Sequence, residues 1–198
     1  MTEADRVVAY HGTTTHRAKR LLSDGFIPSQ NEHDWLGRGT YFFERAPRRA
    51  YEWAVEKIGR DGLDEGEPCV IRACVSLVDC LDLTDTVGTE LVRPWYNEFA
   101  AAVGEELAAT LKQGPRVRQL DRAVIDFAVP HVEEFGYRVA SVRCAFAEGE
   151  PVWTSPSGQR SGILDRNHVQ IAVRHPAIIK QPCLVDTPRL GLPGVLDV

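Results

Sequence analysis

The chain of 198 residues carries 43% hydrophobic and 26% charged residues, and its net charge is −5. This composition is typical of one globular domain, and the negative charge excludes a general attraction for nucleic-acid backbones. No apolar run approaches the roughly 20 residues of a membrane helix. The acidic N-terminus lacks the basic region of a secretory signal, so we expect a cytoplasmic protein without membrane contact.

The five cysteines form no CxxC pair and have no interleaved histidines. Such spacing argues against a disulfide framework and against a zinc site. We therefore expect no bound metal and interpret the cysteines as small hydrophobic residues in strands. Two arginine clusters, at 45–49 and 116–122, are typical of solvated helix or loop faces.

Turn residues and hydrophobic patterning predict the first elements of the chain. Residues Arg6–Tyr10 are short, apolar and β-branched, and they predict a strand that stops in a turn at His11-Gly12. Thr14 or Thr15 can cap the helix that follows, and Gly25 ends that helix as a left-handed cap.

The remaining elements mix helices and strands in an irregular order. Pro47 suits the first turn of a helix with an apolar stripe as far as Ile58. Further strands are expected at 39–43, 69–77, 81–83, 137–146 and 168–173, and further helices at 89–112 and 120–135. A long loop at 147–167 is rich in Gly, Ser and Pro, and such loops often belong to sites.

The irregular order predicts an α+β fold rather than a doubly wound sheet. We expect one domain over residues 1–198, with a helical insert at about 87–135. The proline-punctuated tail at 176–198 is expected to wrap the surface.

Three residues near the first two predicted strands suggest a ligand-binding cleft. His11 follows a strand, so its imidazole can project from a sheet edge. Gly12 lets a ligand approach a peptide N–H and C=O, a donor and acceptor pair that suits a carboxamide. The alternatives are a core histidine beside a turn glycine, and a Tyr41 that only packs on the sheet. The residues by themselves leave both interpretations open.

A run of motifs follows in order through the segment from Tyr10 to Ala54. They are His11-Gly12-Thr13 after a strand, a short helix ending in Gly25-Phe26, the strand Gly37-Arg38-Gly39-Thr40-Tyr41-Phe42, and an alanine-bearing helix at 47–54. This segment resembles the first half of the catalytic domain of poly(ADP-ribose) polymerase-type ADP-ribosyltransferases, the diphtheria-toxin-type class with a His and a Tyr in the site. The resemblance covers roughly a quarter of the chain, and residues 70–85 also resemble a strand pair of such domains.

The resemblance implies an ADP-ribosyltransferase fold, in which two packed, mostly antiparallel sheets and flanking helices surround an NAD cleft. It implies that His11 hydrogen-bonds the adenosine-side ribose with support from Thr13. The Gly12 peptide would hold the nicotinamide carboxamide, and Tyr41 would stack on the nicotinamide ring. Gly39 belongs to the same cofactor-binding segment.

The sequence departs from the family pattern at the residue that opens a late strand. The family has a glutamate there, and we align Gln170 with it, although His168 fits under a two-residue shift. Strand alternation would point both side chains to one face. An uncharged amide in place of a carboxylate costs about 1–2 kcal/mol and disfavours chain elongation. We therefore expect mono-transfer, NAD hydrolysis, or binding without turnover.

A second departure lies on the predicted helix that begins at Pro47. The family's carboxamide-binding serine and its second stacking tyrosine fall at Arg49 and Glu52, which cannot do the same work. Tyr51 or Trp53 would supply the second aromatic wall if the helix were shifted by one residue, and Trp53 equally fits the core.

The loop at 147–167 corresponds to the region where related transferases recognise the acceptor. Trp153, Arg160 and Asp165 are our candidates for contact with the target. Glu148 and Glu150 are either solvated loop acids or stand-ins for the missing carboxylate.

The function implied by the resemblance is that of an enzyme with NAD as its substrate and no metal. It would be a mono-ADP-ribosyltransferase, a glycosyltransferase acting on a protein, nucleic acid or small molecule as a bacterial-type toxin or regulator. Its partners would be NAD, that acceptor and, for a toxin, an antitoxin or immunity protein. One alternative is an RNA 2′-phosphotransferase, which needs more clustered arginines than Arg38 and Arg174 provide. Another is a degenerate pocket that binds NAD or ADP-ribose without breaking it.

Overall fold

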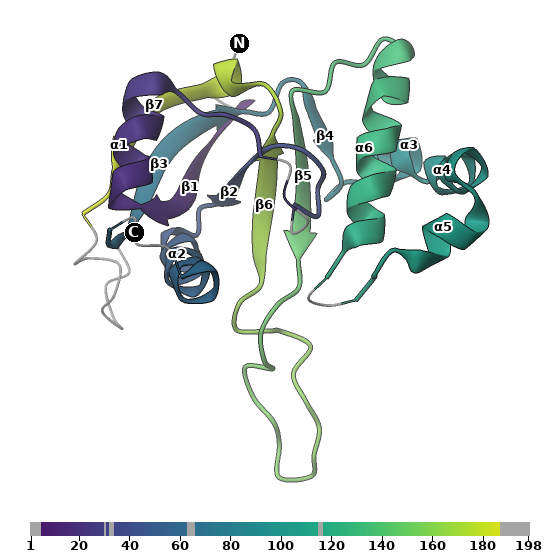
Figure 1. The fold of residues 1–198 in the computed structure, drawn as a ribbon. Coiled ribbons are helices and arrows are strands. Elements are labelled where there is room, and N and C mark those ends of the chain that lie inside the picture. Colours follow the sequence, from purple (N-terminus) through teal and green to yellow (C-terminus); the bar gives the residue numbers. More distant parts are fainter. Residues whose placement is uncertain (1–4, 30, 32–33, 63–65, 115–116, 187–198) are drawn as a thin grey trace.

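A computed structural model of the chain describes residues 5–29, 31, 34–62, 66–114 and 117–186. Seven strands form one sheet in the order β4-β5-β6-β2-β1-β3-β7 (Figure 1). The strands are β1 Arg6–Thr14, β2 Thr40–Glu44, β3 Pro68–Ser76, β4 Cys80–Asp82, β5 Ser141–Phe146, β6 His168–Val173 and β7 Ile179–Leu184. The helices are α1 Thr15–Asp24, α2 Pro47–Asp61, α3 Thr86–Val92, α4 Trp95–Val103, α5 Glu105–Thr110 and α6 Gln119–Glu134, and a 3-10 turn spans Pro176–Ile178.

The α+β class is confirmed, because the strands pair antiparallel except for the parallel β4 and β5. The expected division into two packed sheets is not observed among the described strands. Strand β6 pairs with β2 from Thr40↔Val173 to Glu44↔Val169 and with β5 along its whole length. Hydrogen bonding is therefore continuous across the middle of the sheet, and no break separates two layers.

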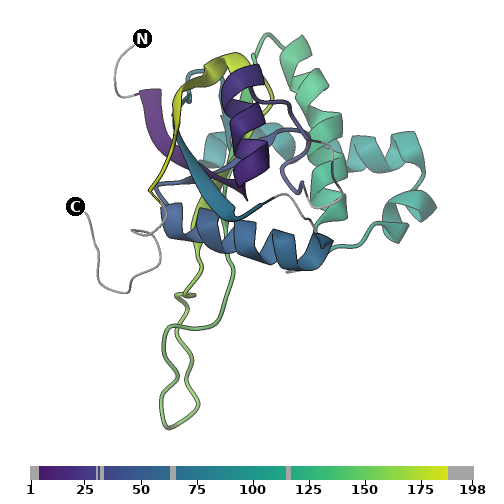
Figure 2. The same cartoon turned by 60° about the vertical axis from the view of Figure 1, so that its left-hand side comes forward.

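The two faces of the sheet are covered by different helices. One face carries Phe42 and Ile171, which pack with Ala18 of α1 in one core cluster. On the other face Val142 and Ala172 pack against the α6 residues, including Ile125. Helix α2 lies on that second face as well, over β1, β2 and β3. The loop between β5 and β6 projects away from the sheet in both views (Figures 1 and 2).

Strand β1 runs further than the sequence predicts. We expected it to end at Tyr10, yet it continues through His11 and Gly12 to Thr14, because β3 pairs with it along that whole length. Thr14 caps α1 as predicted, since its hydroxyl accepts a hydrogen bond from the Arg17 N–H at 3.4 Å. Gly25 ends α1 with the expected positive φ of 92°, although its ψ of 174° lies outside the left-handed helical region.

The predicted helical stretch 89–112 consists of three short helices, α3, α4 and α5. They are interrupted at Pro94 and Gly104, residues that end helices for known reasons. The tail holds an unpredicted strand, β7, which pairs with β3 at the edge of the sheet. The part of the tail at 187–198 lies outside the described residues. Across the described ranges, no helix combines the length and the apolar character that crossing a membrane requires.

Helix α2 approaches β1 with backbone against backbone at Gly12. A Cβ atom built on Gly12 would lie 1.9 Å from the carbonyl oxygen of Ala50, a distance that real structures do not show. Any side chain there would push α2 off the sheet.

We predict that Gly12→Ala lowers the free energy of unfolding by about 3 kcal/mol or more, because overpacking against backbone cannot relax through a rotamer change. Gly59→Ala is the matched control: it lies inside α2, and an added Cβ meets nothing within 4 Å. This control should be neutral or stabilising by up to about 1 kcal/mol. Urea unfolding of both variants tests the contact, and equal stabilities would contradict it.

Candidate functional site

The candidate site begins where β1 and β2 separate. Their pairing ends at Tyr10↔Phe43, while β1 continues to Thr14. The Val8 carbonyl accepts a hydrogen bond from the Arg45 N–H on the β2 side at 3.0 Å, and the Asp5 carbonyl accepts one from Leu77 on the β3 side at 2.8 Å. Peptide groups alternate along a strand, so even-numbered residues of β1 face β2. The Gly12 N–H and C=O therefore point into the opening beyond the last paired residues.

His11 lies beside this opening with its tautomer fixed. Its Nδ1 is 2.8 Å from the Tyr41 carbonyl oxygen, which can only accept, so Nδ1 carries the proton and Nε2 is an acceptor. Nε2 makes no hydrogen bond with the residues that the structure describes. The ring packs edge-on to Phe26, at 6.0 Å between centroids, and against Phe42. Burial lowers the pKa of His11 to about 4, so the imidazole is neutral at pH 7.

Tyr41 is held by its own loop. Its hydroxyl accepts a hydrogen bond from the Leu36 N–H at 2.8 Å and donates one to the Gly37 carbonyl at 2.8 Å. Burial raises the pKa of Tyr41 well above its usual range, so it stays a neutral phenol. The structure thus joins His11 to the Tyr41 backbone. The two side chains have separate contacts: the His11 ring packs on Phe26 and Phe42, whereas the Tyr41 hydroxyl is hydrogen-bonded to Leu36 and Gly37.

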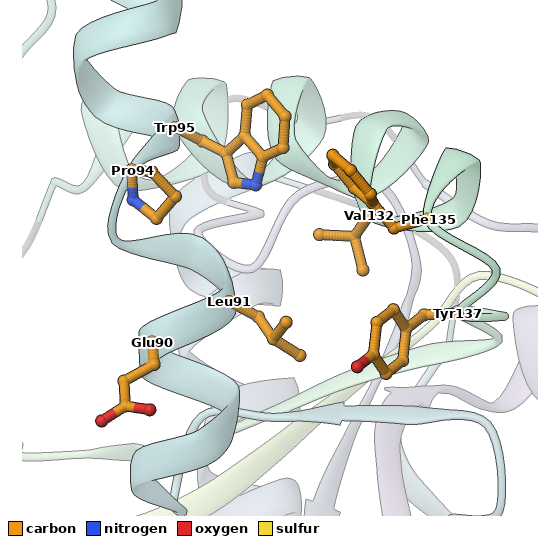
Figure 3. A pocket seen from close by; sticks show the side chains of 7 residues that line it. All are labelled: Glu90, Leu91, Pro94, Trp95, Val132, Phe135 and Tyr137. Atoms are coloured by element: carbon orange, nitrogen blue, oxygen red, sulfur yellow. The ribbon is translucent and has the colours of Figure 1, made fainter.

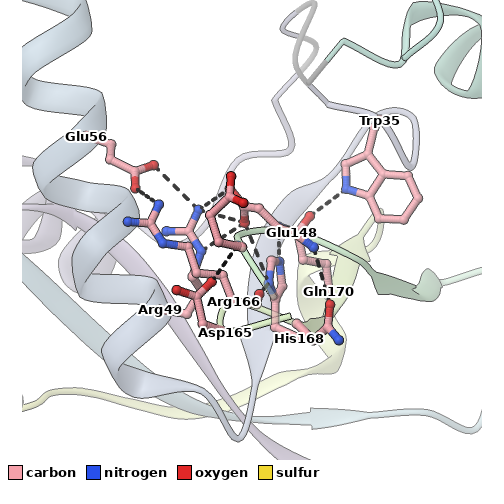
Figure 4. Close-up of polar contacts among 10 residues, drawn as sticks. Trp35, Arg49, Glu56, Glu148, Asp165, Arg166, His168 and Gln170 are labelled. Carbon is pink, nitrogen blue, oxygen red and sulfur yellow. Dashed lines mark hydrogen bonds and ion pairs between the residues drawn. The ribbon is translucent and has the colours of Figure 1, made fainter. Parts of the chain in front are cut away.

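Gln170 sits on the same face of the sheet as Tyr41, because Tyr41 pairs with Ala172 and Phe43 pairs with Gln170. Its Oε1 accepts a hydrogen bond from the indole N–H of Trp35 at 2.6 Å (Figure 4). Its Nε2 lies 2.9 Å from Nε2 of His168, whose Nδ1 is 2.7 Å from the Arg166 carbonyl. The Trp35 indole only donates and the Arg166 carbonyl only accepts. Each hydrogen bond in this chain of contacts is therefore donated in the direction from Trp35 through Gln170 and His168 to Arg166, and His168 is neutral. Burial also lowers the pKa of His168.

Beside this chain lies an ion-pair network that joins α2 to the long loop. The Arg49 guanidinium contacts the Glu148 carboxylate through Nε at 3.0 Å and Nη2 at 2.9 Å (Figure 4). Arg166 pairs with Glu56 of α2 at 3.0 Å. Arg49 is buried, with its side chain 7% exposed, so the prediction of a solvated arginine face at 45–49 is wrong at this residue. Its Nη1 is buried without a hydrogen-bond partner among the described residues.

The other predicted cofactor-binding residues have structural neighbours of their own. Thr13 is buried in β1, and an added Cβ on Gly39 would lie 3.0 Å from the carbonyl carbon of Ala172. Tyr51 and Trp53 pack around the cluster of Phe43, Ala50 and Val70 rather than around the Tyr41 ring. The structure therefore groups Tyr41, His168 and Gln170 on one face, and it places the α2 aromatics in a neighbouring cluster.

The predicted acceptor-contacting residues lie along the projecting loop. Trp153 is 56% exposed, and Arg160 pairs with Glu150 at 3.1 Å. Asp165 accepts a hydrogen bond from the Glu150 N–H at 2.9 Å. Glu150 is thus a loop acid engaged within its own segment, while Glu148 contacts Arg49 next to the Gln170 chain.

Sequence reasoning missed Trp35, Phe146 and Arg118. The Arg118 guanidinium carbon lies 4.7 Å from the Trp35 ring centroid and 4.5 Å from that of Phe146. Phe146 lies two residues after Cys144, so strand alternation puts both side chains on one face, and Cys144 pairs with Gln170. Alternation could therefore have indicated that Phe146 lies on the face of Gln170. Trp35 and Arg118 lie in segments with no periodicity, so no local pattern brings them to this site. Over the described ranges, no group of three or more His, Cys, Asp or Glu residues is placed to hold a metal ion.

No family model matches the chain. A segment of 49 residues, 24% of the chain, is 39% identical to Uncharacterized protein MJ0359 of Methanocaldococcus jannaschii. The chain spans about a fifth of that relative's length, since the match covers 22% of it.

We predict that acid destabilises the protein partly through His11. Its pKa is about 4 when folded and about 6.5 when unfolded, so the unfolded chain binds the proton first as pH falls. The stability contributed by the neutral ring is complete above pH 6.5 and is lost progressively toward pH 4, with a slope of up to about 1.4 kcal/mol per pH unit.

The test compares wild type with His11→Asn in urea unfolding between pH 7.5 and 5. The Asn side-chain amide can still donate to the Tyr41 carbonyl but does not titrate in this range. The variant curve should therefore be flatter than the wild-type curve. Parallel curves would show that His11 is exposed to solvent.

We also predict that Gln170→Glu raises the pKa of His168. A glutamate would still accept from Trp35, but its second oxygen would face the unprotonated Nε2 of His168, and this repulsion is relieved when the imidazole takes a proton. Nuclear magnetic resonance titration of His168 in both proteins measures the shift. Glu148→Gln is the control, since it removes a carboxylate 3.8 Å from the same ring and should lower that pKa.

Proposed function

We propose that the chain is an NAD-dependent mono-ADP-ribosyltransferase that binds its substrate at the opening between β1 and β2. The observation that carries the proposal is the pairing of two features at that opening. The Gly12 peptide presents a donor and an acceptor beyond the last β1–β2 pair, and the preceding residue, His11, has a neutral ring whose Nε2 makes no hydrogen bond with the described residues. A carboxamide and a ribose hydroxyl have the complementary groups.

In this proposal the Gly12 N–H donates to the nicotinamide carbonyl and the Gly12 C=O accepts from the carboxamide N–H. The ribose hydroxyl donates to Nε2 of His11, which is unprotonated because Nδ1 already donates to the Tyr41 carbonyl. Tyr41 forms the aromatic boundary of the nicotinamide site, with its hydroxyl anchored on Leu36 and Gly37. A ring held at its far end keeps a fixed plane for stacking.

The reaction breaks the bond between nicotinamide and the ribose C1, and the pair of electrons leaves with the nicotinamide. Positive charge develops on the ribose, as in glycoside cleavage, and the acceptor nucleophile then bonds to C1 and releases its proton. Gln170 can still use the second lone pair of its Oε1 and the second N–H of its amide. It has no charge to activate a second ribose as an acceptor, so transfer of a single unit is favoured over chain growth.

Two observations favour a second candidate, binding of NAD or ADP-ribose without turnover. Gln170 is uncharged and already holds Trp35 and His168, and the nearby Glu148 carboxylate is neutralised by the two-point contact with Arg49. Stabilisation of positive charge on the ribose is then weak. The same site would then serve as a sensor of NAD or ADP-ribose.

The acceptor, in the transferase proposal, approaches along the projecting loop at 147–167. Trp153 offers an exposed ring there, and Arg160 and Asp165 lie in the same segment. A toxin of this kind would be neutralised by an antitoxin or immunity protein that covers the loop.

Incubation with NAD labelled on the adenine side distinguishes the candidates. Covalent label on an acceptor protein or nucleic acid supports transfer, and free ADP-ribose without covalent label supports hydrolysis. Saturable binding with no release of nicotinamide supports the sensor. Absence of both binding and nicotinamide release would sink the proposal.

Two variants test the assigned atoms. His11→Ala should weaken NAD binding by about tenfold, the effect of losing one well-formed hydrogen bond together with ring packing. His16→Ala, on the exposed side of α1, is the matched control and should bind normally. Tyr41→Phe keeps the ring but loses both anchoring hydrogen bonds, so binding should weaken less than in Tyr41→Ala. Calorimetric titration with NAD measures all four, and normal binding by His11→Ala would reassign the site.

A further inference from the structure

A separate pocket lies where the end of α3, the start of α4 and the end of α6 meet. Its volume is about 460 Å³, within the range of small-molecule sites. None of the described residues that line it belongs to the candidate site at the β1–β2 opening. A ligand here would occupy a site separate from the one proposed for NAD.

Three aromatic side chains surround the cavity: Trp95 at the start of α4, and Phe135 and Tyr137 in the segment that follows α6 (Figure 3). Phe135 is 74% exposed and Tyr137 is 54% exposed, so these rings do not serve the core. The Trp95 ring is stacked by His131 at 4.5 Å between centroids, which fixes the orientation of the indole. His131 is itself held, with Nδ1 2.8 Å from the Phe127 carbonyl. The aromatic walls are thus partly preorganised.

The lining of this pocket offers aromatic faces and no basic side chain. The described lining includes no lysine or arginine. Glu90 belongs to the lining, but its side chain leaves α3 on the side away from the three rings (Figure 3). Aromatic faces carry negative electrostatic potential, so the three rings favour a cation and disfavour an anion.

The rest of the lining is aliphatic: Leu91, Pro94 and Val132. A primary ammonium ion or a metal ion keeps a strong hydration shell and gains little from such walls. An ammonium ion that carries alkyl groups is weakly hydrated, spreads its charge over methyl groups and fills an apolar cavity. We propose that this pocket binds a small alkylated ammonium cation, with the three rings as cation–π partners.

Titration of the full chain with choline tests the proposal, and 3,3-dimethylbutan-1-ol serves as the uncharged isostere of the same shape. Indole N–H resonances follow the binding, and Trp95→Phe assigns the signal from position 95. Choline should shift that signal saturably, and the isostere should bind at least about fivefold more weakly. Rising ionic strength should weaken choline alone.

Variants locate the site. Glu90→Gln should change choline binding by less than about twofold, because this carboxylate points away from the rings (Figure 3). Phe135→Leu should weaken it by about three- to tenfold while keeping the apolar volume. The matched control is Glu98→Gln, an exposed acid on α4 that does not line the pocket. These side chains are exposed or at the rim, so the variants should remain folded.

Two results would overturn the proposal. Equal affinity for choline and for its neutral isostere would define a merely hydrophobic pocket. Absence of any saturable shift at Trp95 up to about 50 mM choline, far above the affinity of even weak aromatic sites, would show that no cation site exists. Unchanged NAD binding in Glu90→Gln and Phe135→Leu is expected in every case, because the two sites share no residue.

Discussion

The close contact between α2 and β1 at Gly12 is the constraint on which the rest of the site depends. Because a Cβ at Gly12 would meet the Ala50 carbonyl, α2 can lie directly on the sheet only with glycine at that position. The approach brings Arg49 and Glu56 within reach of the loop that joins β5 to β6. A larger separation would leave a buried guanidinium without its carboxylate, which costs several kcal/mol. The backbone contact therefore also fixes the base of the loop.

Two kinds of polar contact meet on this face of the sheet, and they differ in character. Trp35, Gln170 and His168 form a neutral chain in which each donor has one acceptor and the direction is set by its ends. Arg49 and Glu148 form a charged pair beside it. The neutral chain is held by hydrogen bonds between uncharged groups, while in the ion pair the positive charge of Arg49 cancels the negative charge of Glu148. Neither leaves a free carboxylate near Gln170. Under either candidate function, the site would therefore stabilise positive charge on a ribose only weakly.

Local sequence determined much of the fold. The cap at Thr14 and the start of α2 at Pro47 each rest on a short-range backbone preference that is read directly from the chain. The helix interruptions at Pro94 and Gly104 rest on preferences of the same kind, but we predicted one helical stretch across them. Strand β7 escaped prediction because Pro182 argues against a strand, although an edge strand tolerates proline. The length of β1 was underestimated because its last residues depend on a partner, β3, rather than on their own propensities.

The candidate site was less predictable than the fold, for a physical reason. Tyr41 and Gln170 stand on predicted strands, so alternation indicates their faces in advance, whereas His11 was expected in a turn. Arg49 and Glu148 are 99 residues apart, and Trp35 and Gln170 are 135 apart. No periodicity links such positions, and a charged cluster looks solvated until its distant partner is known. Contacts of this kind follow from the packing of α2 and the loop, not from local pattern.

The sequence offered Gly12 as a turn glycine or as part of a ligand-binding site. The structure adds a packing role against α2, and this role does not compete with the proposed binding role. The packing role concerns the direction perpendicular to the sheet, where the α-carbon meets α2. The binding role concerns the plane of the sheet, where the N–H and C=O point toward the β2 side beyond Tyr10↔Phe43. A residue with a side chain at this position would clash with α2, whether or not its peptide group bound a ligand. Helix packing alone thus requires the glycine, while the availability of its peptide group for a ligand depends on the point at which β2 separates from β1.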